Sequence, residues 1–487
     1  MKKLIFALLA IFATFTLSTA QPADSTASKA KSGENETNQT PASTEEQIAN
    51  VKGEVDGLNE SYLETKATVG ALAKIKVSGY IQAQYMVADV KNGALSATYN
   101  VPGNAIGKTV YSREAFLIKR GRLKTTYDAG LAQYVLELDA TQDGVGVKDA
   151  YASFSEPWLK LFKATIGAMD RPFGYEVSYS SSQLESPERS RIIGNLFPKE
   201  KDIGAMIEFA QEDGPMSWLN IKGGYYNGMT NITDEDDDYK DLIGRVGVKI
   251  PLQQAGFDIE GGASGYFGNV TDYDTTGAGT GIAGREFEPT NSATTGWTMT
   301  TGQKGKLFKR DYFGADLQLY YATPVIGGTC LKGEYIQGYH PTKSGAADFY
   351  GSGASVTAGN AIYERPISGF YAYFIQNIDP ASLQIVLKYD VYDPNTKVKA
   401  GDFTTANTAA GATALTNQDL AYSTFGFGLL YYLPWAPNLR LQLYYEMPKF
   451  EKLDATKVAA ASPLYSYTSF NSGNNMNLLT FRVQTKF

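Results

Sequence analysis

The chain has 487 residues, among them 33 Tyr, 24 Phe and 49 Gly, and its formal net charge is −7 at pH 7. Plentiful aromatic residues and glycines, without alternating strand and helix patterns, are typical of an all-β protein. The acidic balance argues against nucleic acid as a partner, and the single cysteine, Cys330, excludes an internal disulfide.

The N-terminus has the pattern of an export signal followed by a linker. Two lysines precede an apolar run over 4–17, and small residues at 18–20 form the expected cleavage site, so 1–20 is predicted to be a signal peptide. Its removal would change the formal charge from −7 to about −9, because Lys2 and Lys3 are its only charged residues. Residues 21–44 are polar and lack hydrophobic periodicity, which predicts a disordered linker.

Residues 45–75 change character and predict a helix. Apolar and Thr positions follow the a/d spacing of a heptad repeat at Ile48, Val51, Val55, Leu58, Tyr62, Thr65, Val69 and Leu72. Two interpretations remain open: an amphipathic helix packed on its own domain, or a short periplasmic coiled coil that joins copies of the chain. The coiled coil is favoured, with either two or three strands. Three glycines, each costing about 1 kcal/mol in a helix, indicate that it needs association to be stable.

From residue 76 to residue 487 the chain shows sixteen segments of alternating polar and apolar residues. Short turns and long polar connections mostly alternate between these segments. This is the pattern of an antiparallel transmembrane β-barrel of the outer-membrane type. A soluble β-sandwich is the alternative, and the number and asymmetry of the segments disfavour it.

The faces of the segments support the barrel. Segment 438–449 places leucines on one face and Arg440, Gln442 and Glu446 on the other. Apolar faces with aromatic residues at their edges suit contact with lipid. We therefore expect outer-membrane lipid and lipopolysaccharide as partners, and a location in the outer membrane of a Gram-negative bacterium. Segment 366–377 leaves open which way Phe370 and Phe374 face.

The connection 171–201 is about thirty residues long and joins two neighbouring strands, a length that is uncommon unless a loop is functional. Its basic residues, with those of segment 113–127, are candidate pore or anion-binding residues: Arg120, Arg122, Arg171, Arg189, Arg191, Lys199 and Lys201. Two of its acidic residues, with the Asp that directly follows it, are candidates for bracing the loop: Glu176, Glu188 and Asp202. We expect Arg120 and Arg122 to face the loop arginines across the narrowest water path. A solvated strand end and internal pairing within the loop are the alternatives.

No arrangement of residues predicts catalysis, a metal or a cofactor. His340 is the only histidine and lies in a predicted loop, without a recognisable nucleophile or ligand set around it. The acidic run at 234–238 fits no calcium-binding loop. We therefore expect a protein that is not an enzyme.

Several motifs resemble the phosphate-selective porins O and P, which are trimeric sixteen-stranded outer-membrane channels. They are KRGR at 119–122, VKDAYASF at 147–154, RPFG at 171–174 and KDIG at 201–204. The resemblance implies a homotrimer in which 171–201 is the third external loop, folded into the barrel as its constriction. It also implies passage of small hydrophilic solutes, with a preference for anions such as phosphate. The alternatives are a non-selective porin and a barrel with a structural or surface-interaction role.

Overall fold

The computed structural model describes residues 44–90, 114–142, 144–211, 214–229, 238–252, 256–271, 282–288, 296–301, 307–343, 362–408, 415–460, 462–468 and 476–487. The predicted signal peptide and the linker up to residue 43 lie outside these ranges. The chain divides into two units, Met1–Val69 and Gly70–Phe487.

The described part of the first unit is one long helix, α2 (Thr44–Leu72), whose last three residues fall in the second unit. The sequence predicted a helix over 45–75, and the helix ends three residues earlier. Its heptad residues from Val51 onward are uncovered within a single chain: Val51 is 58% exposed and Leu58 is 70% exposed. Such a row of exposed apolar side chains usually marks an association surface. Among the described residues, no helix is both long and apolar enough to cross a membrane.

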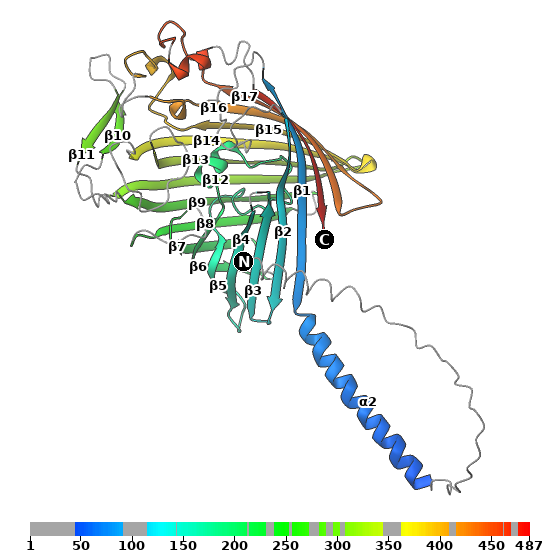
Figure 1. Ribbon diagram of the computed structural model, residues 1–487. Coiled ribbons are helices and arrows are strands. Elements are labelled where there is room, and N and C mark those ends of the chain that lie inside the picture. The colour runs from blue at the N-terminus through cyan, green and yellow to red at the C-terminus, as the bar shows by residue number, and fades with distance from the viewer. Residues whose placement is uncertain are drawn as a thin grey trace, which may run out of the picture. The chain divides into compact units, whose positions relative to one another are not determined.

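The second unit is built mainly from strands (Figure 1). They are β1 (Ile75–Val90), β2 (Glu114–Asp128), β3 (Ala132–Thr141), β4 (Gly144–Ser155), β5 (Phe162–Asp170), β6 (Lys201–Ala210), β7 (Leu219–Tyr226), β8 (Asp241–Leu252), β9 (Phe257–Thr271), β10 (Ile282–Glu288), β11 (Gly296–Thr301), β12 (Leu307–Thr323), β13 (Gly327–Lys343), β14 (Ile362–Ile378), β15 (Leu383–Asp393), β16 (Tyr422–Tyr432), β17 (Leu439–Phe450) and β18 (Met476–Lys486). A short helix, α3 (Arg191–Leu196), lies between β5 and β6.

Sixteen of these strands close into an antiparallel barrel, as the sequence predicted. Each strand from β1 to β8 pairs with the next, β9 pairs with β12, and β12 to β18 continue in order. Pairing of β1 with both β2 and β18 closes the circuit. The last residue takes part, since the backbone N–H of Phe487 donates to the carbonyl of Gly79 at 3.0 Å. Closure leaves the wall without an exposed strand edge.

Strands β10 and β11 form an additional hairpin outside this circuit. The sequence of 269–307 is that of a long polar connection between two barrel segments, and it did not predict this hairpin. Residues Ala283 and Gly284 of β10 pair in parallel with the start of β14.

The outer face of the barrel is apolar, and the inner face is polar and aromatic. Outward side chains that are at least 37% exposed include Ile81, Phe116, Tyr127, Tyr134, Ile166, Trp218, Val246, Leu317, Tyr335, Leu443 and Phe481. The structure also shows which way the side chains of β14 face. Phe370 and Phe374 are exposed on the outside, whereas Tyr371 and Tyr373 are buried on the inside. Such a belt matches the hydrocarbon of a bilayer.

Two β-bulges change the direction of lysine side chains. In the pairing of β1 with β2, Gln82 opposes Arg120 and the next residue opposes Ile118, so Lys119 is the extra residue. In the pairing of β3 with β4 the register shifts in the same way, and Lys148 is the extra residue. A bulge interrupts strict alternation. Lys119 and Arg120 therefore both reach the lumen.

Candidate functional site

The connection between β5 and β6, residues 171–200, is called the loop from here on. It lies inside the barrel and packs on the inward-facing residues of the wall. Its apolar side chains are at most 1% exposed: Phe173, Val177, Leu184, Ile192, Ile193, Leu196 and Phe197. All of them except Leu184 share one cluster with wall residues such as Tyr226, Tyr266, Tyr312 and Tyr371. Apolar burial on this scale fixes the loop against the wall.

Aromatic pairs define the packing at the start of the loop. The ring centroids of Phe173 and Phe197 are 5.2 Å apart, and Phe173 meets Tyr312 edge-on at 6.2 Å. Phe197 meets Tyr266 edge-on at 6.0 Å. Each such pair contributes about 0.5–1.5 kcal/mol beyond its buried area. The two ends of the loop are thereby held together and against the wall.

Glu188 lies at the centre of a basic cluster on the wall. Its carboxylate is 3.2 Å from Lys119 Nζ, 3.1 Å from an Arg120 guanidinium nitrogen and 3.1 Å from one of Arg482. Gln82 supports the cluster by accepting a hydrogen bond from Arg120 at 2.9 Å. Three cations therefore share one carboxylate.

Arg189 is the hydrogen-bonding centre of the loop. Its guanidinium donates to the backbone carbonyls of Glu176 at 2.9 Å and Tyr179 at 2.7 Å, and to the Ser181 hydroxyl at 3.1 Å. It also forms an ion pair with Glu200. Because these acceptors come from different parts of the loop, Arg189 fixes its path.

Glu200 connects this centre to the wall. Besides Arg189 it pairs with Lys148, the residue that the second bulge turns inward. Lys119 and Lys148 thus have matching roles, since each is the extra residue of a β-bulge and forms an ion pair with one glutamate of the loop.

Burial alone would raise the pKa of Glu188, but Lys119, Arg120 and Arg482 hold it well below its ordinary value. Burial also opposes ionisation of Glu200, and Arg189, Lys148 and Arg122 hold the pKa of this carboxyl well below its ordinary value. Both loop carboxylates are therefore ionised at neutral pH.

These pKa shifts predict how the loop responds to acid. Because the folded loop lowers the pKa of Glu188 and of Glu200, their ionised forms stabilise it. This stabilisation is complete at any pH above 4.5, the ordinary pKa of glutamate. The stabilisation is lost as the pH falls through the lowered values. Single-channel conductance should thus rise as the pH falls below 4.5. A conductance that stays unchanged in this acidic range would contradict this account.

Glu176 anchors the loop through neutral donors. Its carboxylate accepts hydrogen bonds from the Ser190 backbone N–H at 2.8 Å and the Tyr373 hydroxyl at 2.9 Å. Its own backbone N–H, together with that of Tyr175, donates to Glu334 of β13. Glu176 therefore lies within a bracing network rather than in an ion pair.

The remaining predicted loop residues lie apart from the Glu188 cluster. Arg191 is 2% exposed and its guanidinium is 3.1 Å from Glu446 of β17. Arg171 is fully buried, lies over the Phe197 ring and donates to the carbonyl of Lys199. The Lys199 side chain is exposed.

Two predicted basic residues of the wall pair with wall carboxylates. Arg122 lies between Glu137 and Asp139, at 3.5 and 3.3 Å. Lys201 of β6 is 2.6 Å from Asp149 and 2.9 Å from Asp170. Neither faces a loop arginine.

Asp202 was predicted to brace the loop. It lies in β6, and its carboxylate accepts from the Gly228 backbone N–H at 2.9 Å, which ties β6 to the next connection. Its link to the loop is electrostatic attraction to Arg171.

The expected arrangement, with Arg120 and Arg122 facing the loop arginines, is therefore wrong. The loop presents the carboxylate of Glu188 to Arg120, while Arg189 and Arg191 bind other partners. The physical reason is charge pairing, since cations brought together at low dielectric need a counter-charge.

Sequence reasoning missed the importance of two wall arginines. Arg482 pairs with Glu188, and Arg440 is its electrostatic neighbour and donates to Gln484 at 2.9 Å. Alternation along β17 and β18 already placed both side chains on the inner face. Their proximity to β2 follows only from barrel closure, in which β18 and β2 flank β1.

His340 is not in a loop, as the sequence suggested, but within β13. It is 1% exposed, and its Nδ1 is 2.6 Å from the Tyr312 hydroxyl. Within the described part of the chain no group of three or more His, Cys, Asp or Glu residues could hold a metal ion. The acidic run 234–238 lies almost wholly outside that part.

Among the comparisons with known proteins, solved structures gave matches. No protein-family model and no curated protein matches the chain. The solved structure of OprB from Pseudomonas putida has a TM-score of 0.52 at 8% identity, and the match covers 86% of this chain and 96% of that chain. An anion-selective porin from Comamonas acidovorans has a TM-score of 0.45 at 12% identity, and the match covers 85% of this chain and 99% of that chain. The trimer form of OmpT from Vibrio cholerae has a TM-score of 0.45 at 9% identity, and this match also covers 85% of this chain and 99% of that chain.

At 8% identity, the similarity to OprB bears on the fold alone. The closed circuit of sixteen strands and the apolar outer belt agree with that fold. This is a transmembrane barrel of the outer membrane of Gram-negative bacteria. The chain has the fold of the outer-membrane porins.

Proposed function

We propose that the protein is a passive diffusion channel for small hydrophilic solutes, with a modest preference for anions such as phosphate. The observation that supports this most directly is the cluster around Glu188. Lys119, Arg120, Arg440 and Arg482 contribute four positive charges against that one carboxylate.

An unbalanced group of cations beside a narrow water path attracts anions. A patch of one sign in a channel with low-dielectric walls raises the local concentration of counter-ions. Arginine suits phosphate in particular, because its planar fork can donate two hydrogen bonds at once. The resemblance to the phosphate-selective porins agrees with this preference, and 171–201 would then form the constriction.

The preference should be modest, because most other charges on the inner wall are balanced. Arg245 pairs with Asp316, Arg310 pairs with Asp241, and Arg122 lies between Glu137 and Asp139. A paired cation attracts anions weakly. This balance also favours the second candidate, a general porin without ion preference.

Planar lipid bilayers test the proposal directly. Purified protein should give open steps of porin size, and a salt gradient should give a zero-current potential that shows a modest anion preference. A clear cation preference would refute the anion assignment and leave a general porin. If correctly folded protein gives no open steps, the result would instead favour a structural or surface-interaction barrel.

We further propose that the protein forms a homotrimer, with α2 as a periplasmic coiled coil. The exposed heptad residues of α2 support association between copies. The barrel unit has its own closed circuit of strand pairs, so it should fold without this segment. Deleting 21–74 should leave a folded barrel whose oligomer dissociates at a lower temperature, as seen by gel mobility after heating. An oligomer of unchanged heat resistance would contradict the role of α2.

A further inference from the structure

Two tyrosines of the loop lie between two cavities inside the barrel. A cavity of about 510 Å³ and another of about 420 Å³ are both lined by Tyr175 and Tyr179. Both volumes fall within the range of roughly 300–1,000 Å³ that is usual for small-molecule sites. Both cavities adjoin short turns: Gly256 and Gly328 line the first, and Gln211 and Ser217 line the second. They therefore lie on the short-turn side of the loop.

The two tyrosines form a prepared aromatic surface. Their rings stack with centroids 5.0 Å apart and an interplanar angle of 28°. Lys332 Nζ lies 4.2 Å from the Tyr179 ring centroid and 5.3 Å from that of Tyr175, a cation–π arrangement that fixes both rings. Both side chains remain partly exposed to the cavities.

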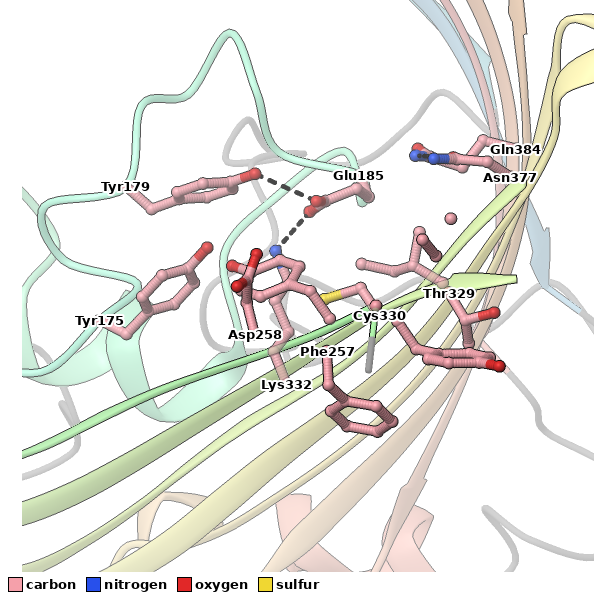
Figure 2. A pocket seen from close by; sticks show the side chains of 16 residues that line it. Tyr175, Tyr179, Glu185, Phe257, Asp258, Thr329, Cys330, Lys332, Asn377 and Gln384 are labelled. Carbon is pink, nitrogen blue, oxygen red and sulfur yellow. Dashed lines mark hydrogen bonds and ion pairs between the residues drawn. The ribbon is translucent and has the colours of Figure 1, made fainter. Parts of the chain in front are cut away.

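Polar groups surround this surface in the larger cavity (Figure 2). Glu185 accepts hydrogen bonds from the Tyr179 hydroxyl at 3.1 Å and from Lys332 at 2.7 Å. Asn377 and Gln384 lie across the cavity from the tyrosines and are joined to each other by a hydrogen bond of 2.8 Å. The cavity thus has an aromatic side and a side of amide groups.

The charges of this cavity do not favour an anion. Lys332 is neutralised by Glu185, and Asp258 adds a further carboxylate to the lining. Three cations line the smaller cavity, and each has a carboxylate partner: Lys249 pairs with Glu260 at 2.6 Å, Lys222 with Glu208 at 3.2 Å, and Arg245 with Asp316. A ligand that binds between Tyr175 and Tyr179 and the polar groups of these cavities should therefore be neutral. It should have both an apolar face and many hydroxyl groups.

We propose that the Tyr175–Tyr179 surface binds a neutral sugar as it passes through the channel. The C–H groups of a pyranose ring form a flat apolar face that packs on an aromatic ring, and its hydroxyls bond to carboxylate and amide groups at the edge. Because both cavities meet at the tyrosines, a sugar can move from one to the other without leaving the aromatic surface. This inference rests on the proposed channel function.

Maltose is a suitable probe in bilayers. It should cause reversible closures of the open channel in a concentration-dependent manner. Changing Tyr175→Ala and Tyr179→Ala together should raise the half-blocking concentration about ten-fold, because the stacking contacts are lost. The pair Tyr175→Phe and Tyr179→Phe keeps the rings and should stay close to wild type. Tyr335→Ala, on the outer face of the same strand as Lys332, is the matched control and should have no effect.

Cys330 supplies a second readout that does not need ion flow. This single cysteine lines the larger cavity. Maltose should slow its modification by N-ethylmaleimide in detergent-solubilised protein, and the double alanine variant should need about ten-fold more maltose for the same protection. Inorganic phosphate at equal concentration should not protect.

The outcomes separate this inference from the channel function. Open steps without maltose block and without Cys330 protection would overturn the sugar site and leave the channel intact. Protection of Cys330 without open steps would support the site and refute the channel. Equal protection by phosphate would overturn the neutral sugar as the ligand class.

Discussion

Replacing Arg189 with alanine is expected to raise single-channel conductance and current noise while leaving ion preference nearly unchanged. The guanidinium donates to two backbone carbonyls and a hydroxyl of the loop and pairs with Glu200. Removing one partner of such a buried pair typically costs about 3–5 kcal/mol. The loop should then lose its fixed path and widen the water path. Bilayer recordings measure both quantities.

Lys199→Ala is the matched control for this change. It removes one positive charge from the same loop, but its side chain is exposed. The control should conduct like the wild type. If Arg189→Ala does the same, the loop either does not restrict the channel or does not depend on Arg189.

Replacing Glu188 with glutamine is expected to strengthen the anion preference. The change keeps the size of the side chain and removes the carboxylate that, among the described residues, pairs with Lys119, Arg120 and Arg482. One unit charge a few ångströms from the ion path changes the energy by on the order of 1 kcal/mol, or about five-fold in ion occupancy. The zero-current potential should shift accordingly in a salt gradient.

Glu208→Gln is the control for Glu188→Gln. Glu208 also pairs with two cations, Lys163 and Lys222, yet it lies near the short-turn end of β6, away from the cluster. Both variants lose one negative charge, so only the position differs. Equal potentials from the two variants would show that the Glu188 cluster does not determine selectivity.

The sequence by itself determined the number of barrel strands and the direction of most side chains. Alternation is a local property of an extended chain, and therefore β17 could be read directly: Arg440 and Gln442 face inward and Leu443 faces outward. Strand β14 was ambiguous because aromatic residues occupy both of its faces. Pairing with β13 decided it, since Phe370 is opposite the outward Tyr335.

Only the tertiary structure decided which charges meet. Strict alternation gives no sign that Lys119 turns inward, because a bulge depends on the register with the neighbouring strand. Arg120 and Arg482 are far apart in the sequence, and closure of the barrel through β1 brings them to one carboxylate. Composition shows only that positive and negative charges are nearly equal in number. Their pairing in space determines that Arg189 holds the loop while the cations around Glu188 remain in excess.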